Sequence, residues 1–588
     1  MTDPFAHLHD EGYAAGFARG RVGHADLIAM SGRRTVSLNG TWKFTPDLFD
    51  EGLRQKWYLW RRDPPARWDW PRDYDEEAAY DMTVPSCWNL ARAEWMYFEG
   101  SGWYARDFTW PAPMHGERTF LRIGAANYEA RVFLNGAFIG SHRGGSTPFF
   151  LELTDALRGL NHLLIQVENR RERQRVPMHH FDWFNYGGLY REVELVHLPP
   201  LFVRSFNVGL TNDGARIAAS LALSGPGDGQ AVLEIPELDV RVVFPVANGE
   251  GRIEFDALPE RWSPETPRLY NVVLRYGADV LTERVGFRTI ACEGHEILLN
   301  GRPVWLRGLC VHEDDLALGK VSEEADVRRR FAHAKEMGCN MLRLAHYPHH
   351  EMVARIADEV GLLLWSEIPV YWAIDFDNPD TWADAENQLL EMIGRDGNRA
   401  SVIIWGVGNE NADTDARFHF MARLAEAARA VDPSRLIGAA CLINRVEFRI
   451  EDRLTDSLDI IGLNEYFGWY ERDFSGLERL LANSNPGKPV VISEVGADAL
   501  AGHRGRADEL FTEDCQADIY RRQLETIAAA EYVRGFCPWL LYDYRTERRQ
   551  TRFQRGWNRK GLIAEDKTTK KLAFGVVADA YRRLAGNR

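Results

Sequence analysis

The sequence lacks the cysteine patterns of a metal site or a disulfide framework. Its seven cysteines are scattered over 588 residues, and no two of them form a CxxC pair or the spacing of zinc ligands. We therefore expect reduced, mostly buried thiols. Neither a metal site nor a disulfide-stapled fold is expected.

Positive charge and long apolar runs are also scarce. The formal net charge is −15, which argues against nucleic acid or an anionic membrane as the main partner. No apolar run reaches about 18 residues, and the first residues show no basic start followed by an apolar core. We expect a cytoplasmic protein with no nucleic-acid or membrane partner.

The first third of the chain has the pattern of an all-β domain. Residues 1–30 carry few apolar anchors and predict an N-terminal arm, whereas residues 31–200 alternate short strands with glycine-rich turns. The pairs Asn39-Gly40 and Asn135-Gly136 each predict a tight hairpin turn. This pattern predicts a β-sandwich, interrupted by an ordered excursion at residues 45–80 whose role the sequence does not reveal.

A stiff break at Leu198-Pro199-Pro200 separates this domain from a second set of short strands at residues 201–290, which predicts a smaller sandwich of immunoglobulin size. From residue 291 to 588 the pattern changes to buried strands alternating with helical stretches. Eight such strands predict a (β/α)8 barrel, whose chemistry lies at the C-terminal strand ends. The predicted strands lie at 304–307, 341–344, 362–365, 402–405, 436–439, 460–463, 490–492 and 535–541.

Two of these strands end in a single acid. The apolar run that starts at Ser401 ends in Asn409 and Glu410, and the run that starts at Val490 ends in Glu494. Glycoside cleavage needs one acid to protonate the leaving oxygen and another to attack the sugar. The alternative is that each glutamate is only a salt-bridged strand end.

The other strand ends carry further polar and aromatic residues, so spacing alone does not choose the catalytic pair. His346 follows the second strand, Tyr466 the sixth, and Trp539 lies in the eighth. Glu367 and Glu465 are also acids at strand ends. For His346 and Tyr466, a substrate contact and a structural hydrogen bond are equally open.

Gly408-Asn409-Glu410 and Ser493-Glu494 are the motifs by which the sequence resembles glycoside hydrolase family 2, and within it the β-glucuronidases. The resemblance covers nearly the full chain. It implies a jelly-roll sugar-binding domain, an immunoglobulin-like domain and a catalytic barrel. It also implies a retaining mechanism without a cofactor, with Glu494 as nucleophile and Glu410 as acid/base. Retention requires the two carboxyl groups to lie about 5 to 5.5 Å apart.

The same resemblance implies a substrate-binding set for a β-glycoside with a terminal uronic acid. Asn558 and Lys560 match an Asn-x-Lys motif that grips the sugar carboxylate, and Asp182 matches an acid that reaches the sugar hydroxyls from the first domain. A neutral sugar would leave the Lys560 ammonium unpaired, although Lys560 is alternatively read as a surface residue of a basic tail. The full predicted set is Asp182, His346, Asn409, Asn464, Tyr466, Tyr470, Trp539, Asn558 and Lys560.

The sequence also departs from the family pattern. Gln554 stands where members often carry arginine, and the residues after Trp539 differ from those of the best-known members. These departures leave a β-galacturonidase or a β-galactosidase-type enzyme open beside the β-glucuronidase. A catalytically silent carbohydrate-binding protein is the alternative from another class. We expect a homo-oligomer, and the natural leaving group stays open.

Overall fold

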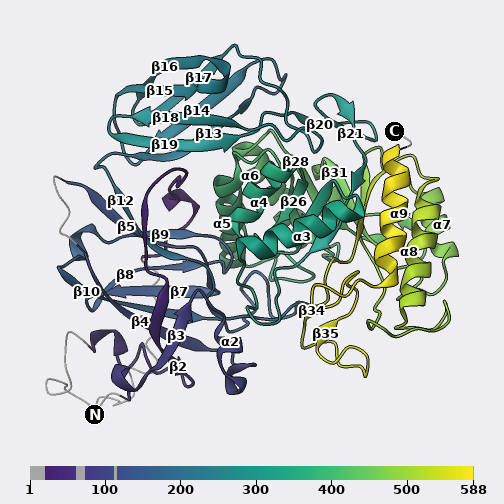
Figure 1. Cartoon of the computed structure of the whole chain (residues 1–588), viewed down its shortest axis with the longest axis horizontal. Coiled ribbons are helices and arrows are strands. Elements are labelled where there is room, and N and C mark those ends of the chain that lie inside the picture. The colour runs from purple at the N-terminus through teal and green to yellow at the C-terminus, as the bar shows by residue number, and fades with distance from the viewer. Residues whose placement is uncertain (1–19, 61–72, 111–115, 587–588) are drawn as a thin grey trace.

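The computed structural model describes residues 20–60, 73–110 and 116–586. Figure 1 shows the strands of the N-terminal region, a second group of strands, and a barrel surrounded by helices. Nineteen residues of the predicted arm and residues 61–72 of the predicted excursion lie outside the described ranges. Within these ranges, no helix is long and apolar enough to cross a membrane.

The N-terminal region is a sandwich of two antiparallel sheets around an apolar core. Trp42, Tyr104, Val132 and Leu195 belong to this core and are almost fully buried. The smaller sheet has the order β1 (Thr35–Ser37), β12 (Val193–Leu198), β5 (Arg118–Ile123) and β9 (Phe149–Glu152). The larger has the order β3 (Tyr80–Val84), β2 (Gly40–Asp47), β4 (Ser101–Thr109), β10 (Leu160–Glu168), β7 (Glu129–Leu134) and β8 (Ala137–Arg143).

Only one of the two predicted hairpin turns is present. Asn135 and Gly136 connect β7 to β8 with φ of 53° and 81°, as a two-residue hairpin turn requires. The prediction for Asn39-Gly40 was wrong, because β1 and β2 enter different sheets. The Asn39 side chain instead accepts a hydrogen bond from the Val193 backbone N–H at 3.0 Å.

The second group of strands forms a seven-stranded antiparallel sheet with its own apolar core. Its strands are, in spatial order, β13 (Val203–Leu210), β14 (Ile217–Leu223), β17 (Glu250–Phe255), β16 (Val240–Ala247), β15 (Gly229–Ile235), β18 (Tyr270–Tyr276) and β19 (Asp279–Val285). The names jelly roll and immunoglobulin-like, and the boundaries at residues 30, 200 and 290, stay predictions.

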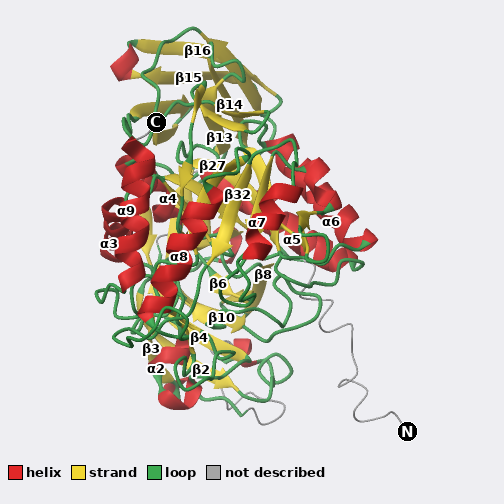
Figure 2. Cartoon of the chain, turned by 90° about the vertical axis from the view of Figure 1, so that its right-hand side faces the viewer, coloured by secondary structure: helices red, strands yellow, loops and turns green. Residues whose placement is uncertain are grey.

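The remaining chain forms the predicted barrel, whose helices surround the strands (Figure 2). All eight predicted strand positions are occupied by parallel strands. They are β23 (Leu306–Arg307) with β24 (Cys310–Val311), β25 (Met341–Leu344), β26 (Leu363–Glu367), β27 (Val402–Asn409), β28 (Leu436–Cys441), β31 (Ile460–Asn464), β32 (Val490–Val495) and β33 (Val533–Pro538). The barrel helices are α3 (Glu324–Met337), α4 (Glu351–Val360), α5 (Pro379–Asp396), α6 (Asp415–Val431), α7 (Ser475–Asn483), α8 (Glu513–Ile527) and α9 (Leu572–Gly586).

The first barrel strand consists of two short pieces that pair with different neighbouring strands, and this pairing closes the sheet. β23 pairs with β33, and β24 pairs with β25. Gly308 lies between the two pieces, where an added Cβ would meet Cys537 Sγ at 2.3 Å. A glycine at this position therefore lets the last strand approach the first.

The eighth strand begins and ends earlier than its predicted span of 535–541. β33 ends at Pro538, and the Trp539 N–H donates to Val495 O at 2.7 Å. The Leu541 N–H then donates to Cys310 O at 3.0 Å. Trp539 is therefore positioned just beyond the strand, above the end of the barrel.

Candidate active site

The two candidate catalytic acids lie at the C-terminal ends of barrel strands and belong to one connected group. Asn409 ends β27 and Glu410 follows it, while Glu494 is the penultimate residue of β32. Asn464, which ends β31, donates to Asn409 Oδ1 at 3.0 Å. The Tyr466 hydroxyl donates to Glu494 Oε2 at 2.8 Å. The structure thus brings these five predicted residues together.

Arg343, which the sequence analysis did not select, lies at the centre of this group. Its guanidinium donates to both oxygens of Glu367 at 2.9 and 3.0 Å. It also donates to Glu494 Oε1 at 2.8 Å and to Asn409 Oδ1 at 2.6 Å. The side chain is fully buried in β25. A charged residue inside an otherwise apolar strand was the signal that could have identified it.

The hydrogen bonds separate the candidate acids from the other acids at strand ends. Glu367 is occupied by Arg343 and by His346 Nδ1, which lies 2.7 Å from its Oε1. Glu465 lies away from this network, since its Oε2 accepts from Gln523 Nε2 at 3.0 Å. Both acids therefore have structural partners. Across the described ranges, no three His, Cys, Asp or Glu residues form a group that could hold a metal ion.

Glu410 has the environment of a proton donor. It is partly exposed, and Trp372 Nε1 donates to its Oε2 at 2.8 Å. Although part of the residue is exposed, its carboxyl group is largely removed from water; this burial raises the pKa of Glu410, and the nearby charge of Glu494 raises it further. Because a raised pKa keeps a carboxyl group protonated to higher pH, this environment favours an acid role.

Glu494 has the environment of a carboxylate held in place. Its Oε1 accepts from Arg343 and its Oε2 from Tyr466, both at 2.8 Å. His346 Nε2 lies 3.6 Å from Oε1. Donors on both oxygens fix the orientation of this side chain, as a nucleophilic carboxylate requires.

An aromatic wall stands beside these acids. The His346 ring stacks on Trp539 with centroids 4.9 Å apart and lies 4.8 Å from Tyr371. Trp183, from the segment between β10 and β12 of the N-terminal sandwich, packs against Tyr371 at 5.0 Å and His346 at 5.7 Å. The site is therefore built by two domains.

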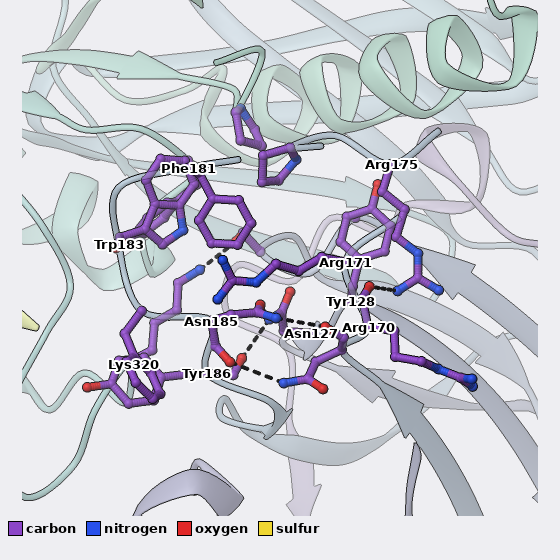
Figure 3. Close-up of a pocket in the computed structure, with 17 residues that line it drawn as sticks. Asn127, Tyr128, Arg170, Arg171, Arg175, Phe181, Trp183, Asn185, Tyr186 and Lys320 are labelled. Atoms are coloured by element: carbon purple, nitrogen blue, oxygen red, sulfur yellow. Dashed lines mark hydrogen bonds between the residues drawn. The ribbon is translucent and has the colours of Figure 1, made fainter. Parts of the chain in front are cut away.

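The segment that carries Trp183 also delivers Asp182. Asp182 accepts from Thr546 Oγ1 at 3.0 Å and forms an ion pair with Arg549. Figure 3 shows how this segment is fastened to the sandwich, with Asn127 Nδ2 donating to Asn185 Oδ1 at 3.2 Å. Asp182 thus contacts the barrel region, where its carboxylate is paired with an arginine that the sequence analysis missed, and its predicted contact with the sugar hydroxyls stays a prediction.

Lys560 is buried, so its alternative interpretation as a surface residue was wrong. Its side chain is 1% exposed, and Nζ donates to Asp498 Oδ2 at 2.6 Å and to the Tyr470 hydroxyl at 3.1 Å. Burial alone would lower the pKa of Lys560, but the Asp498 carboxylate raises it above its ordinary value. Arg549 Nη1 also donates to the Tyr470 hydroxyl, at 3.0 Å.

Asn558 and Gln554 complete this side of the site. Asn558, in the short strand β35 (Trp557–Asn558), donates to the Tyr544 hydroxyl at 3.0 Å and accepts from the Lys560 backbone N–H at 3.1 Å. Gln554 donates to Asp498 Oδ1 at 3.0 Å. All the predicted site residues therefore lie in one region, and their contacts with a sugar stay a prediction.

The family models match most of the chain. The model described as "Glycosyl hydrolases family 2, TIM barrel domain" matches residues 290–584, and the "sugar binding domain" model of the same family matches residues 35–199.

Similar proteins include a β-glucuronidase from Paenibacillus borealis, 28% identical over 92% of this chain and 96% of its own. The human β-glucuronidase is 27% identical over 94% of this chain and 91% of its own. Among solved structures, Ruminococcus gnavus β-glucuronidase in complex with D-glucuronic acid has a TM-score of 0.82 at 26% identity, with 95% of this chain and 99% of that chain covered.

The barrel match alone covers half of the chain, and the sandwich match extends the agreement to the N-terminal region. The site geometry agrees with both, because acids and donors from the barrel meet side chains from the sandwich. The chain belongs to glycosyl hydrolases family 2.

Proposed function

We propose that the protein is a retaining exo-β-glucuronidase, in which Glu494 attacks the anomeric carbon and Glu410 protonates the leaving oxygen. The observation that carries this assignment is the unequal environment of the two acids. Arg343 and Tyr466 donate one hydrogen bond to each oxygen of Glu494, whereas burial raises the pKa of Glu410. The similar proteins named as β-glucuronidases support the choice of substrate.

The proposed reaction has two steps. In the first, a Glu494 oxygen forms a bond to the anomeric carbon while the glycosidic oxygen leaves with the Glu410 proton. In the second, Glu410 takes a proton from water, and the water oxygen displaces Glu494. Asn409 would hold the 2-hydroxyl group, where hydrogen bonds strengthen in the transition state.

Recognition of the uronate is proposed for Lys560, Asn558 and Tyr470. Lys560 and Arg549 both bond the hydroxyl of Tyr470, which places two cations beside a side chain that is 56% exposed. A β-galacturonide stays the second candidate, because it carries the same carboxylate and Gln554 departs from the family arginine. The two uronides differ only at C4.

Substitution of each acid should give a different dependence on the leaving group. Glu494→Gln should abolish turnover, since it removes the proposed nucleophile. Glu410→Gln should slow alkyl glucuronides far more than aryl glucuronides with acidic phenols, because a good leaving group needs no proton in the first step. Rates on a series of leaving groups measure this. If Glu410→Gln hydrolysed an alkyl glucuronide at the wild-type rate, Glu410 would not be the acid.

Hydrolysis should release the β-anomer of the sugar first. Two successive displacements at the anomeric carbon restore its configuration. A proton NMR time course, recorded before mutarotation, distinguishes the anomers. Early α-product would show inversion and would require a wider gap between the two carboxyl groups.

The fall of kcat/KM on the alkaline side of the pH profile should be centred at a pH above the ordinary pKa of glutamic acid. Glu410 acts when protonated, so kcat/KM falls as pH rises through its pKa, and the raised pKa moves that fall to higher pH. Glu410→Gln, assayed on an activated aryl glucuronide, should remove this limb. An unchanged limb in the variant would assign it to another group.

Lys560→Met should lower kcat/KM on uronides and leave neutral glycosides little changed. A charge-assisted contact contributes about 1.5 to 3 kcal/mol, which is roughly ten- to hundredfold in rate. The values of kcat/KM on a matched aryl glucuronide, galacturonide, glucoside and galactoside measure this effect. They also identify the preferred epimer.

A second variant controls for the partner of Lys560. Lys560→Met leaves the Asp498 carboxylate buried without its ammonium, and a stranded charge can disturb the site by itself. The double variant Lys560→Met/Asp498→Asn removes both charges and should keep the loss on uronides. Equal losses on charged and neutral sugars in both variants would refute carboxylate recognition by Lys560.

A further inference from the structure

Trp372 is held beside Glu410 in a backbone conformation that tryptophan seldom adopts. Its φ is 53°, in the left-handed region, and Glu410 has the same value. The Trp372 N–H donates to Asn409 O at 2.9 Å, and Asn411 Nδ2 donates to Trp372 O at 2.9 Å. Together with the indole bond to Glu410, these contacts fix the ring. Strain of this kind, imposed by several contacts, is typical of functional sites.

Arg548 lies over this fixed ring and has no anionic partner in the described part of the chain. Its guanidinium carbon is 4.8 Å from the centre of the Trp372 ring, and its side chain is exposed. Across residues 20–60, 73–110 and 116–586, no carboxylate pairs with Arg548 and no acceptor receives its N–H groups. It therefore keeps five donors available in a planar arrangement.

The neighbouring residue Arg549 makes its contacts on the opposite side of the site. Arg549 is paired with Asp182 and bonded to Tyr470, on the side assigned to the uronate. Consecutive arginines between β34 (Tyr544–Arg545) and β35 thus diverge, one toward the uronate side and one toward Trp372. Of these two cations, Arg548 alone lacks a counterion among the residues that the structure describes.

We propose that Trp372 and Arg548 form a leaving-group subsite that selects substrates whose leaving group carries a carboxylate about one ring away from the glycosidic oxygen. This inference rests on the proposed function, because Glu410 must face the leaving oxygen and Trp372 donates to Glu410. The Trp372 ring lies against the Arg548 guanidinium and holds it in place. The Arg548 side chain therefore loses less conformational freedom when an anion binds.

The required carboxylate can come from two sources. One is a second acidic sugar of an oligosaccharide, and the other is an aromatic acid conjugated to the uronate. Both place an anion beyond the leaving oxygen, and Arg548 would contact both through the same paired N–H donors. Separate substrates distinguish them.

The test compares two aryl glucuronides of similar size, 4-carboxyphenyl and 4-carbamoylphenyl β-D-glucuronide. Arg548→Met should lower kcat/KM for the carboxylate by roughly three- to fivefold, the size of an exposed ion pair, and leave the amide within about twofold. The loss should shrink at high salt, since the interaction is exposed. The ratio of variant to wild type cancels the intrinsic reactivity of each phenol.

Arg552→Met is the matched control. Arg552 is likewise exposed, and its guanidinium lies over the Phe553 ring at 4.6 Å in the same loop. The Arg552→Met substitution removes the same charge from the loop without changing a contact of Trp372. It should therefore lower kcat/KM for the carboxylate and the amide substrates equally or not at all. A selective loss in Arg552→Met as large as that in Arg548→Met would show a general charge effect and overturn the subsite.

The second arm uses a β-linked disaccharide of two uronic acids and the same disaccharide with a neutral second sugar. A selective loss in Arg548→Met on the acidic disaccharide identifies an oligosaccharide as the source, and a loss on the aryl carboxylate alone identifies an aromatic acid. If Arg548→Met shows no selective loss in either pair of substrates, the subsite is overturned. Turnover by the wild-type enzyme would still support the proposed function. If the wild-type enzyme cleaved none of these glucuronides, the proposed function would fail, and the subsite with it.

Discussion

The buried guanidinium of Arg343 is the interaction on which the site depends. It bonds both oxygens of Glu367, one oxygen of Glu494 and the amide oxygen of Asn409, and it has no exposed surface. Burial alone would lower the pKa of Arg343, but the charges of Glu367 and Glu494 raise it well above its ordinary value. Two acids in one dry space would otherwise repel each other and take up protons. The planar fork of arginine satisfies several acceptors at once, which an ammonium of lysine could not do in the same geometry.

The same network makes the two candidate catalytic acids chemically different. Glu494 receives donors on both oxygens, so its carboxylate is held in one orientation. Glu410 lies outside the reach of Arg343 and bonds the indole of Trp372, in a position where burial and the charge of Glu494 raise its pKa. Arg343 donates to only one member of the pair, and this difference in environment supports the proposed roles of Glu494 as nucleophile and Glu410 as acid.

The sugar site also depends on contacts between domains. Asp182 and Trp183 come from the N-terminal sandwich and meet Arg549 and His346 of the barrel region. On the side proposed to bind the uronate, each cation has a buried acid as partner, Arg549 with Asp182 and Lys560 with Asp498. These pairs keep ammonium and guanidinium groups charged and oriented without a substrate. Buried cations without partners would be strongly destabilised.

Much of this protein was determined by local patterns in the sequence. The apolar runs that end at Glu410 and Glu494 became β27 and β32, and Gly338 ends α3 with φ of 86°, because these outcomes depend on neighbouring residues and burial. The predicted residues consequently met at one end of the barrel. Only the tertiary structure decided that Asn39-Gly40 joins two sheets instead of making a hairpin. The tertiary structure alone paired Lys560 with Asp498, which are 62 residues apart in the sequence, and Arg343 with Glu494, which are 151 residues apart. These outcomes depend on which distant groups share a buried space, and no local pattern records that.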